Sequence, residues 1–308
     1  MKALITGASS GIGRDIAINL SQKGYDLILV ARNLERLEET KKQIKTNVEL
    51  VSMDISNEEN CKKLFQDHSD IDILVNNAGF GDCGHFEDTS LEKDIQMIRT
   101  NVIAYHILTK LYLKKMMKKN SGKILNVASI AGFIPGPLMA TYYSTKAYVV
   151  RLSESIRTEL KKQNSKVQIS ILCPGPVNTN FNKVADVEFA LKGLSSEYVA
   201  KYAVEKLLKG KFYIVPGWKI KLAKIGAKLA PTNLVSKVSY KMQRRKIKWE
   251  IWINIDAKRK CKNARTRRKD RKSNKTSYPK VEWITWNRFI FRPSSKLLRK
   301  IFRNFKCK

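Results

Sequence analysis

The sequence predicts an α/β fold in which one doubly wound parallel sheet carries helices on both faces. Two observations predict it. Short apolar runs alternate with segments of helical periodicity along residues 1–215, as βαβ units require. The first apolar run also leads directly into a glycine-rich turn, TGASSGIG, that opens a helix. We therefore expect a single domain over residues 1–215, a variable segment over 216–246 and a basic, poorly ordered C-terminal extension over 247–308.

The first half of the chain contains four expected strands. Apolar runs predict strands at 2–6 and 26–31, and the helix between them carries Ile12, Ile16 and Leu20 at helical spacing. Gly24 ends that helix, because glycine is the residue that most easily adopts the left-handed conformation after a helix. The alternation continues with a helix at 34–45, a strand at 48–53, a helix at 58–66 and a strand from Ile71 into Asn76-Asn77-Ala78-Gly79.

The second half repeats the alternation with longer helices. A long helical stretch covers 90–119, and 140–162 forms a second one, because Leu152, Ile156 and Leu160 recur every four residues. Strands are expected at 122–129 and 166–173, then a helix at 195–208 and a short last strand at 212–215.

Charge and cysteine content restrict the class of protein. The 308 residues include 60 Lys+Arg and 27 Asp+Glu, a net charge of +33, and residues 247–308 hold 21 of the basic groups against 4 acidic ones. This asymmetry predicts a basic tail on a moderately basic body. Five scattered cysteines without a C-x-x-C pair argue against a disulfide framework and a zinc site, so we expect no metal.

Apolar segments of the sequence bear on the location of the protein. The start of the chain lacks the long apolar core of a signal peptide, and no run of about 18 apolar residues predicts a spanning helix. We expect a cytoplasmic protein.

Several motifs point to a dinucleotide. Gly7, Gly11 and Gly13 would let backbone N–H groups approach a diphosphate at a helix N-terminus, although an ordinary glycine turn is the alternative. Arg32, at the end of the second strand, favours the extra phosphate of NADP over NAD, and a solvated strand-end arginine is its alternative. Asp54, after the third strand, would lie near the adenine or cap the following helix.

A second group of residues points to proton transfer. Free tyrosine, with a pKa near ~10, is a poor acid at neutral pH, but a nearby positive charge lowers that pKa. Tyr142 and Lys146 share one helix face at spacing four, and Ser129 precedes Tyr142 by thirteen positions. Asn101 lies in the middle of a predicted helix, which is mildly unfavourable, so it either forms a buried hydrogen bond or faces solvent.

Together these pieces resemble the short-chain dehydrogenase/reductase family. They are TGASSGIG, NNAG, Asn101 in NVIAYHILT, Ser129 in ASIAG, YSTK ending at Lys146, and PGPVNT from Pro174 to Thr179, in the family's order over residues 1–215. The resemblance implies a Rossmann-type sheet of seven strands and an NAD(P)-dependent oxidoreductase that interconverts a carbonyl and a secondary alcohol. Only Tyr142, and not Tyr143, has the family's spacing to Ser129 and Lys146.

The resemblance also implies residue roles. Tyr142 exchanges a proton with the substrate oxygen, Ser129 hydrogen-bonds that oxygen, Lys146 lowers the pKa of Tyr142 and holds the nicotinamide ribose, and Asn101 places a water. The implied cofactor-binding residues, for NADP(H) in preference to NAD(H), are Gly7, Ser9, Ser10, Gly11, Ile12, Gly13, Arg32, Asp54, Ile55, Asn77, Ala78, Gly79, Tyr142, Lys146, Pro174, Gly175, Val177 and Thr179.

The C-terminal third of the chain leaves alternatives open. The stretch from Trp218 to Met242 predicts a lid over an apolar substrate, a basic amphipathic helix on an anionic membrane surface, or a helix packed at a subunit interface. The tail, with four of the five tryptophans, is a disordered basic extension, a module for nucleic acid or anionic lipid, or an out-of-frame or read-through end of the gene. We favour the first or the third of these explanations for the tail.

Two classes of function remain after this comparison. The first is an enzyme with a small-molecule carbonyl or alcohol substrate, for which the family resemblance implies a homodimer or homotetramer formed through the helices at 90–119 and 140–162. The second is a non-catalytic nucleotide-binding protein tethered to nucleic acid or an anionic membrane by its tail. The complete set of Ser129, Tyr142 and Lys146 favours the enzyme, because a binding protein has no use for it.

Overall fold

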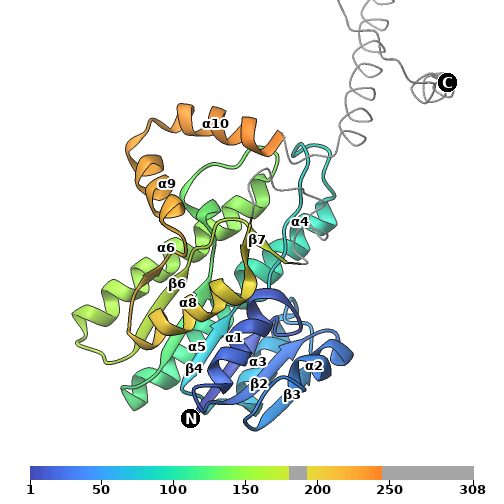
Figure 1. The fold of residues 1–308 in the computed structure, drawn as a ribbon, viewed down its shortest axis with the longest axis vertical. Helices are drawn as coiled ribbons and strands as arrows, with labels where there is room; N and C mark the ends of the chain where they lie inside the picture. The colour runs from blue at the N-terminus through green and yellow to red at the C-terminus, as the bar shows by residue number, and fades with distance from the viewer. Residues whose placement is uncertain (180–192, 245–308) are drawn as a thin grey trace, which may run out of the picture. The chain divides into compact units, whose positions relative to one another are not determined.

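A parallel sheet of seven strands forms the centre of the computed structural model, which describes residues 1–179 and 193–244 (Figure 1). Its strand order is β3-β2-β1-β4-β5-β6-β9, and every neighbouring pair is parallel. The order reverses between β1 and β4, and a crevice opens at such a point in doubly wound sheets. The predicted seven-stranded, Rossmann-type sheet is confirmed.

The strands are short and mostly buried. They are β1 (Lys2–Thr6), β2 (Asp26–Ala31), β3 (Val48–Ser52), β4 (Ile73–Asn76), β5 (Lys123–Val127), β6 (Gln168–Leu172) and β9 (Tyr213–Ile214). Helices cover both faces, so the central strands are nearly continuous apolar runs. Two further strands, β7 (Val177–Asn178) and β8 (Leu194–Ser195), form a separate parallel pair that we did not predict.

Helices lie on both faces of the sheet (Figure 1). The helices of the described residues are α1 (Gly11–Ser21), α2 (Leu34–Lys41), α3 (Glu58–Asp67), α4 (Leu91–Ile98), α5 (Ala104–Lys119), α6 (Ala140–Lys162), α8 (Ser196–Leu208), α9 (Trp218–Leu229) and α10 (Thr232–Arg244). Of these, α9 and α10 follow the last strand away from the sheet. One apolar core joins α1, α2 and α8 to the sheet, and a second joins α3, α5 and α6. Helix α2 is shorter than predicted, because the amides of Gln43 and Ile44 turn back onto the carbonyls of Thr40 and Lys41.

The helix predicted over 90–119 is not continuous. A π-helical turn, Arg99–Ile103, separates α4 from α5. Asn101, at its centre, is fully buried, and its side chain bonds both backbone groups of Phe80. The extra residue of the wider turn points Asn101 inward, as π-bulges at functional sites often do.

The variable segment predicted over 216–246 contains α9 and α10. The described residues belong to one compact unit, Met1–Lys248, and the predicted tail over 247–308 lies outside them. Within residues 1–179 and 193–244, no helix combines the length and apolar character needed to cross a bilayer.

A chain of buried side-chain hydrogen bonds ties the sheet to the helices behind it. Asn76 Nδ2 donates to Thr109 Oγ1 at 3.0 Å and to Asn126 Oδ1 at 2.9 Å. Asn126 Nδ2 donates in turn to Ser153 Oγ at 2.9 Å. These bonds join β4 and β5 to α5 and α6, the helix that carries Tyr142 and Lys146.

Removing the end of this chain should destabilise the fold. Ser153→Ala leaves the buried amide of Asn126 without its acceptor, so we expect the free energy of unfolding to fall by roughly 1–3 kcal/mol. Ser155→Ala, two residues on in α6 and exposed, should change it by less than about 0.5 kcal/mol. Urea titration of both variants measures the difference. Equal stability would contradict a structural role for the network.

Candidate active site

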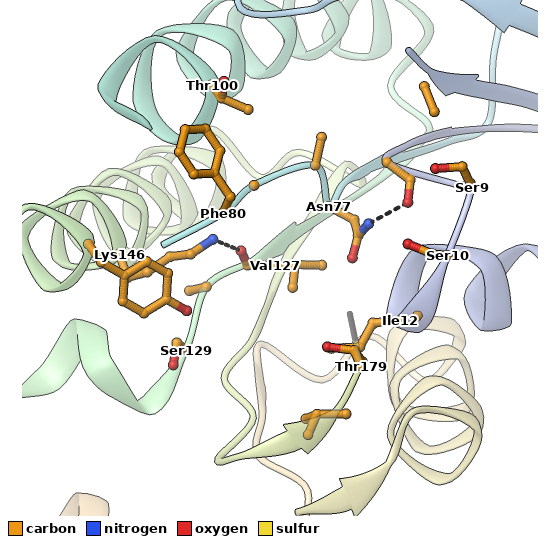
Figure 2. A pocket seen from close by; sticks show the side chains of 18 of the residues that line it. Ser9, Ser10, Ile12, Asn77, Phe80, Thr100, Val127, Ser129, Lys146 and Thr179 are labelled. Atoms are coloured by element: carbon orange, nitrogen blue, oxygen red, sulfur yellow. Dashed lines mark hydrogen bonds between the residues drawn. The ribbon is translucent and has the colours of Figure 1, made fainter. Parts of the chain in front are cut away.

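The strands of the sheet end at one cavity of about 680 Å³ (Figure 2). The predicted site residues that line it are Gly7, Ser9, Ser10, Gly11, Ile12, Arg32, Asp54, Ile55, Asn77, Ala78, Gly79, Ser129, Tyr142, Lys146, Pro174, Gly175, Val177 and Thr179. Figure 2 shows Ser9, Ser10 and Ile12 on one side of the cavity and Ser129 and Lys146 on the other. Of the predicted residues, only Gly13 and Asn101 do not line it.

The glycine turn between β1 and α1 lies against the end of β4. Gly7 has φ +66° and Gly11 has φ +55°, which favours glycine, and a Cβ on Gly7 would lie 2.7 Å from Ala78 Cα. Gly13 lies behind the turn, where a Cβ would collide with the carbonyl of Gly7. Ser10 begins α1 without a side-chain cap. The first amides of α1 therefore face the cavity without intrahelical partners, which fits a diphosphate.

Asn77 fixes the glycine turn to the fourth strand. Its Nδ2 donates to the carbonyls of Thr6 at 3.0 Å and Gly7 at 3.1 Å. Thr6 Oγ1 accepts from the amides of Asn77 and Ala78 at 2.9 and 3.1 Å. The NNAG segment is therefore a brace between two strand ends and not a simple turn.

The end of the cavity at β2 is basic. Arg32 lines it together with Arg36, which the sequence analysis missed although it follows Arg32 at spacing four. Asn33 Oδ1 accepts a hydrogen bond from the backbone amide of Arg36 at 2.8 Å, so Asn33 caps α2. Asp54 is the one carboxylate among the described residues that line the cavity. It accepts the amide of Ser56 at 2.9 Å, while Asn57 caps α3, so Asp54 is not the helix cap.

Tyr142 and Ser129 meet on the opposite side. Tyr142 lies in the first turn of α6, and its hydroxyl is hydrogen-bonded to Ser129. Ser129 follows β5 and also caps a short 3-10 helix, Ile130–Phe133, by accepting the amide of Ala131 at 3.2 Å. The serine hydroxyl is thus held beside the phenol that the sequence spacing selected.

Lys146 is buried one turn beyond Tyr142. Only 4% of it is exposed, and its Nζ donates to the carbonyl of Val127 at 2.9 Å (Figure 2). Two glycines make room for it: a Cβ on Gly132 would lie 2.7 Å from its carbonyl oxygen, and one on Gly79 would lie 3.5 Å from Nζ. Burial lowers the pKa of Lys146 to about 8.

The pKa of Tyr142 differs from the sequence-based expectation. Burial raises it above the ordinary value, and this outweighs the lowering by the hydrogen bond with Ser129. The Lys146 Nζ is turned to the carbonyl of Val127 and lies 5.9 Å from the centre of the Tyr142 ring, so burial outweighs the lowering that the sequence predicted and the net shift of the pKa is upward. The Tyr142 hydroxyl is therefore protonated at neutral pH.

Asn101 supports the site from behind. Its Nδ2 donates to the carbonyl of Phe80 at 2.9 Å and to Thr145 Oγ1 at 3.1 Å, and its Oδ1 accepts the amide of Phe80 at 3.2 Å. Thr145 donates to the carbonyl of Tyr142 at 2.7 Å. The asparagine therefore links the loop after NNAG to the first turns of α6.

The cavity includes residues that no sequence signal identified. Tyr143 lines it, and its hydroxyl accepts a hydrogen bond from Nε2 of Gln243 in α10. Phe80, Lys93, Gln96, Thr100, Ile130 and Met139 also line it. Lys93 and Gln96 lie in α4 and Thr100 in the π-helical turn, while Phe80 and Met139 lie in loops and Ile130 follows Ser129. Their side chains reach the cavity through the fold, which the sequence pattern does not reveal. Among the described residues, no three His, Cys, Asp or Glu side chains gather to hold a metal ion.

Comparison with known proteins identifies the family. A family profile described as short chain dehydrogenase matches residues 1–188. The chain belongs to the short-chain dehydrogenase/reductase family. It is 37% identical to an uncharacterised oxidoreductase of Staphylococcus epidermidis over 188 residues, which is 60% of this chain and 81% of that protein. It is also 37% identical to human dehydrogenase/reductase SDR family member 7, over 58% of this chain and 56% of that protein.

Solved structures of this family contain both nicotinamide cofactors. A short-chain dehydrogenase from Sphingobium yanoikuyae in complex with NADPH has a TM-score of 0.67 and 26% identity, over 74% of this chain and 93% of that one. A family member from Burkholderia phymatum in complex with NAD has a TM-score of 0.67 and 25% identity, over 75% and 96%. This short-chain dehydrogenase/reductase is thus an NAD(P)-dependent oxidoreductase, and its glycine turn and basic cavity end fit such a dinucleotide.

The buried charge of Lys146 should lower the free energy of unfolding of this short-chain dehydrogenase/reductase. Lowering the pKa from 10.5 to about 8 corresponds to a cost of about 3 kcal/mol. Because the folded-state pKa is the lower one, the cost is complete below pH 8 and shrinks as the pH rises toward 10.5. We expect Lys146→Met to raise the melting temperature at pH 7 and to lose this advantage at high pH.

The control for this measurement is Lys110→Met, which removes an exposed lysine from α5. Its melting temperature should stay near the wild-type value across the same pH range. A lower melting temperature for Lys146→Met than for wild type at pH 7 would contradict the cost of burial.

Proposed function

We propose that the chain is an NADP(H)-dependent reductase that interconverts a carbonyl group and a secondary alcohol. The observation that carries this proposal is the hydrogen-bonded pair of Ser129 and Tyr142 beside the buried Lys146. The glycine turn faces that pair across the same cavity. A hydride donor held by the turn would thus lie within the same enclosure as the proton donor.

Each part of the cavity suits one part of the cofactor. The first amides of α1, with Ser9 and Ser10, would hold the diphosphate, and Asp54 and Ile55 would border the adenine. Asn77, Ala78 and Gly79 would border the ribose, and Lys146 would hold the hydroxyls of the nicotinamide ribose. Pro174, Gly175, Val177 and Thr179 would border the nicotinamide, which supplies the hydride.

The basic end of the cavity supports the choice of NADP(H). Arg32 and Arg36 both line it at the end of β2, where an acidic residue would bind the ribose hydroxyls of NAD and an arginine accommodates the 2′-phosphate of NADP. Two guanidinium groups offer paired hydrogen bonds to a phosphate.

The protein residues divide the proton transfer between them. Tyr142 Oη, which is protonated at neutral pH, donates its proton to the carbonyl oxygen. Ser129 Oγ hydrogen-bonds the same oxygen. The ammonium of Lys146 stabilises the negative charge left on Tyr142. Asn101 is a positioning residue, since it acts through Phe80 and Thr145.

The walls next to Tyr142 favour an apolar substituent on the carbonyl. Phe80, Met139 and Tyr143 line this part of the cavity. Bulky apolar walls with a few oriented polar groups are typical of sites for small apolar molecules.

The two adjacent tyrosines provide a matched pair of variants. Tyr142→Phe removes the proton donor, so we expect kcat for carbonyl reduction to fall by about 100-fold or more. Tyr143→Phe removes a hydroxyl that bonds α10 and should keep kcat within about tenfold. NADPH oxidation with a panel of apolar ketones and aldehydes measures both. Equal kcat values in Tyr142→Phe and wild type would exclude this mechanism.

Cofactor choice is tested at the basic end of the cavity. Arg32→Ala and Arg36→Ala should each raise KM for NADPH by about 10-fold to 100-fold, because each removes a charged hydrogen bond to the 2′-phosphate. KM for NADH should change by less than about threefold, since NADH lacks that group. Lys41→Ala removes an exposed charge from α2, the helix that contains Arg36, and serves as the control. Equal increases for both cofactors would contradict the NADP(H) assignment.

A further inference from the structure

Helix α9 is attached to the body of the protein by one face. Ile220 lies so close to Gly175 that a Cβ on the glycine would collide with it. Lys224 Nζ lies over the ring of Tyr213, 3.1 Å from its centre, and 4.5 Å from that of Phe133. These contacts fix which side of α9 faces outward.

The outward face of α9 is apolar. Trp218, Leu222, Ile225 and Leu229 follow one another at spacings of four, three and four, which places them in a single stripe. They are 67%, 58%, 57% and 80% exposed. A helix on a water-soluble body normally turns such a stripe toward the core.

Helix α10, like α9, has apolar side chains on its exposed face. Its buried residues are polar: Ser239 and Gln243 face Tyr143, and Gln243 donates to the Tyr143 hydroxyl. Its exposed residues include Leu234, Val238 and Met242, at spacing four, which are 55%, 51% and 44% exposed. Both helices (orange in Figure 1) therefore present an apolar stripe outward. We call these seven side chains, Trp218 to Met242, the α9–α10 surface.

The charged residues of the segment that forms the α9–α10 surface have one sign. Residues 216–244 contain seven Lys and Arg and no Asp or Glu. Lys219 and Lys221 are exposed on either flank of the α9 stripe, and Lys237, Lys241 and Arg244 are exposed on α10. An apolar stripe flanked by lysine, with a tryptophan at one end, is the pattern of helices that lie in the interface of a bilayer.

We propose that the α9–α10 surface docks this protein on an anionic lipid bilayer, with both helices lying in the plane of the interface. The apolar stripes would enter the boundary between headgroups and acyl chains, and the lysines would meet lipid phosphates and carboxylates. A second copy of the chain fits less well. A two-fold interface would place Lys219, Lys221, Lys237 and Lys241 of one copy against the same residues of the other, and residues 216–244 contain no Asp or Glu to offset them.

The surface also lies next to the cavity. α9 contacts Gly175 and α10 contacts Tyr143, and both of these residues line it. Docking would therefore bring the cavity close to the bilayer. The proposal itself depends on the exposed stripes and the charge, and it does not depend on which substrate the cavity takes.

Vesicle co-sedimentation of the full chain tests the proposal. Phosphatidylcholine vesicles with and without phosphatidylserine are mixed with wild type, with Leu222→Asp/Ile225→Asp, and with Leu34→Asp/Leu91→Asp. The last pair changes two exposed leucines of α2 and α4 and adds the same charge. We expect wild type to bind the anionic vesicles, the α9 variant to bind at least about tenfold more weakly, and the control to keep most of its binding.

Three outcomes would overturn the proposal. The first is failure of wild type to bind anionic vesicles. The second is binding of the α9 variant equal to that of the control, which would place the contact elsewhere, as in the basic tail. The third is a dimer, detected by light scattering without lipid, that only the α9 variant loses. Leu222→Gln/Ile225→Gln, which adds no charge, should also lose binding. NADPH binding by each variant verifies that it is folded.

Discussion

The burial of a lysine ammonium is the constraint on which the site depends. Lys146 is enclosed between β5 and α6, where its Nζ bonds the carbonyl of Val127. Gly79 and Gly132 leave the space that it fills. A buried charge is costly unless it is hydrogen-bonded. The bond from Lys146 to Val127 therefore fixes the position and the orientation of α6 relative to the sheet. That fixed position places Tyr142, one turn earlier, beside Ser129.

The two halves of the site are connected through the backbone of neighbouring strands. Asn77 donates hydrogen bonds from its amide to Thr6 Oγ1 and from its side chain to the Thr6 carbonyl. These bonds join the glycine turn to the end of β4. Asn101 then joins the next residues of that segment to α6 through Phe80 and Thr145. The glycine turn and the Ser129–Tyr142 pair therefore share one hydrogen-bonded frame, which the proposed proton and hydride transfer requires.

Local patterns predicted the strands, the glycine turn and the choice of Tyr142, because each depends on spacing within a few turns of chain. The π-helical turn was missed, since periodicity does not reveal one extra residue held by a contact between Asn101 and Phe80. The bond between Tyr143 and Gln243 joins residues 100 positions apart. The direction of the Tyr142 pKa shift was wrong for a similar reason: it depends on how deeply the phenol is buried, and spacing to Lys146 says nothing of that.

The most direct test of this account is the pKa of Lys146 itself. Carbon-13 NMR of the lysine side chains, titrated against pH, gives it, with the resonance assigned as the one missing from Lys146→Met. The account predicts a midpoint near pH 8, because burial disfavours the ammonium. A midpoint at the ordinary lysine value of 10.5 would show that the ammonium is hydrated, and the frame described around it would be incorrect.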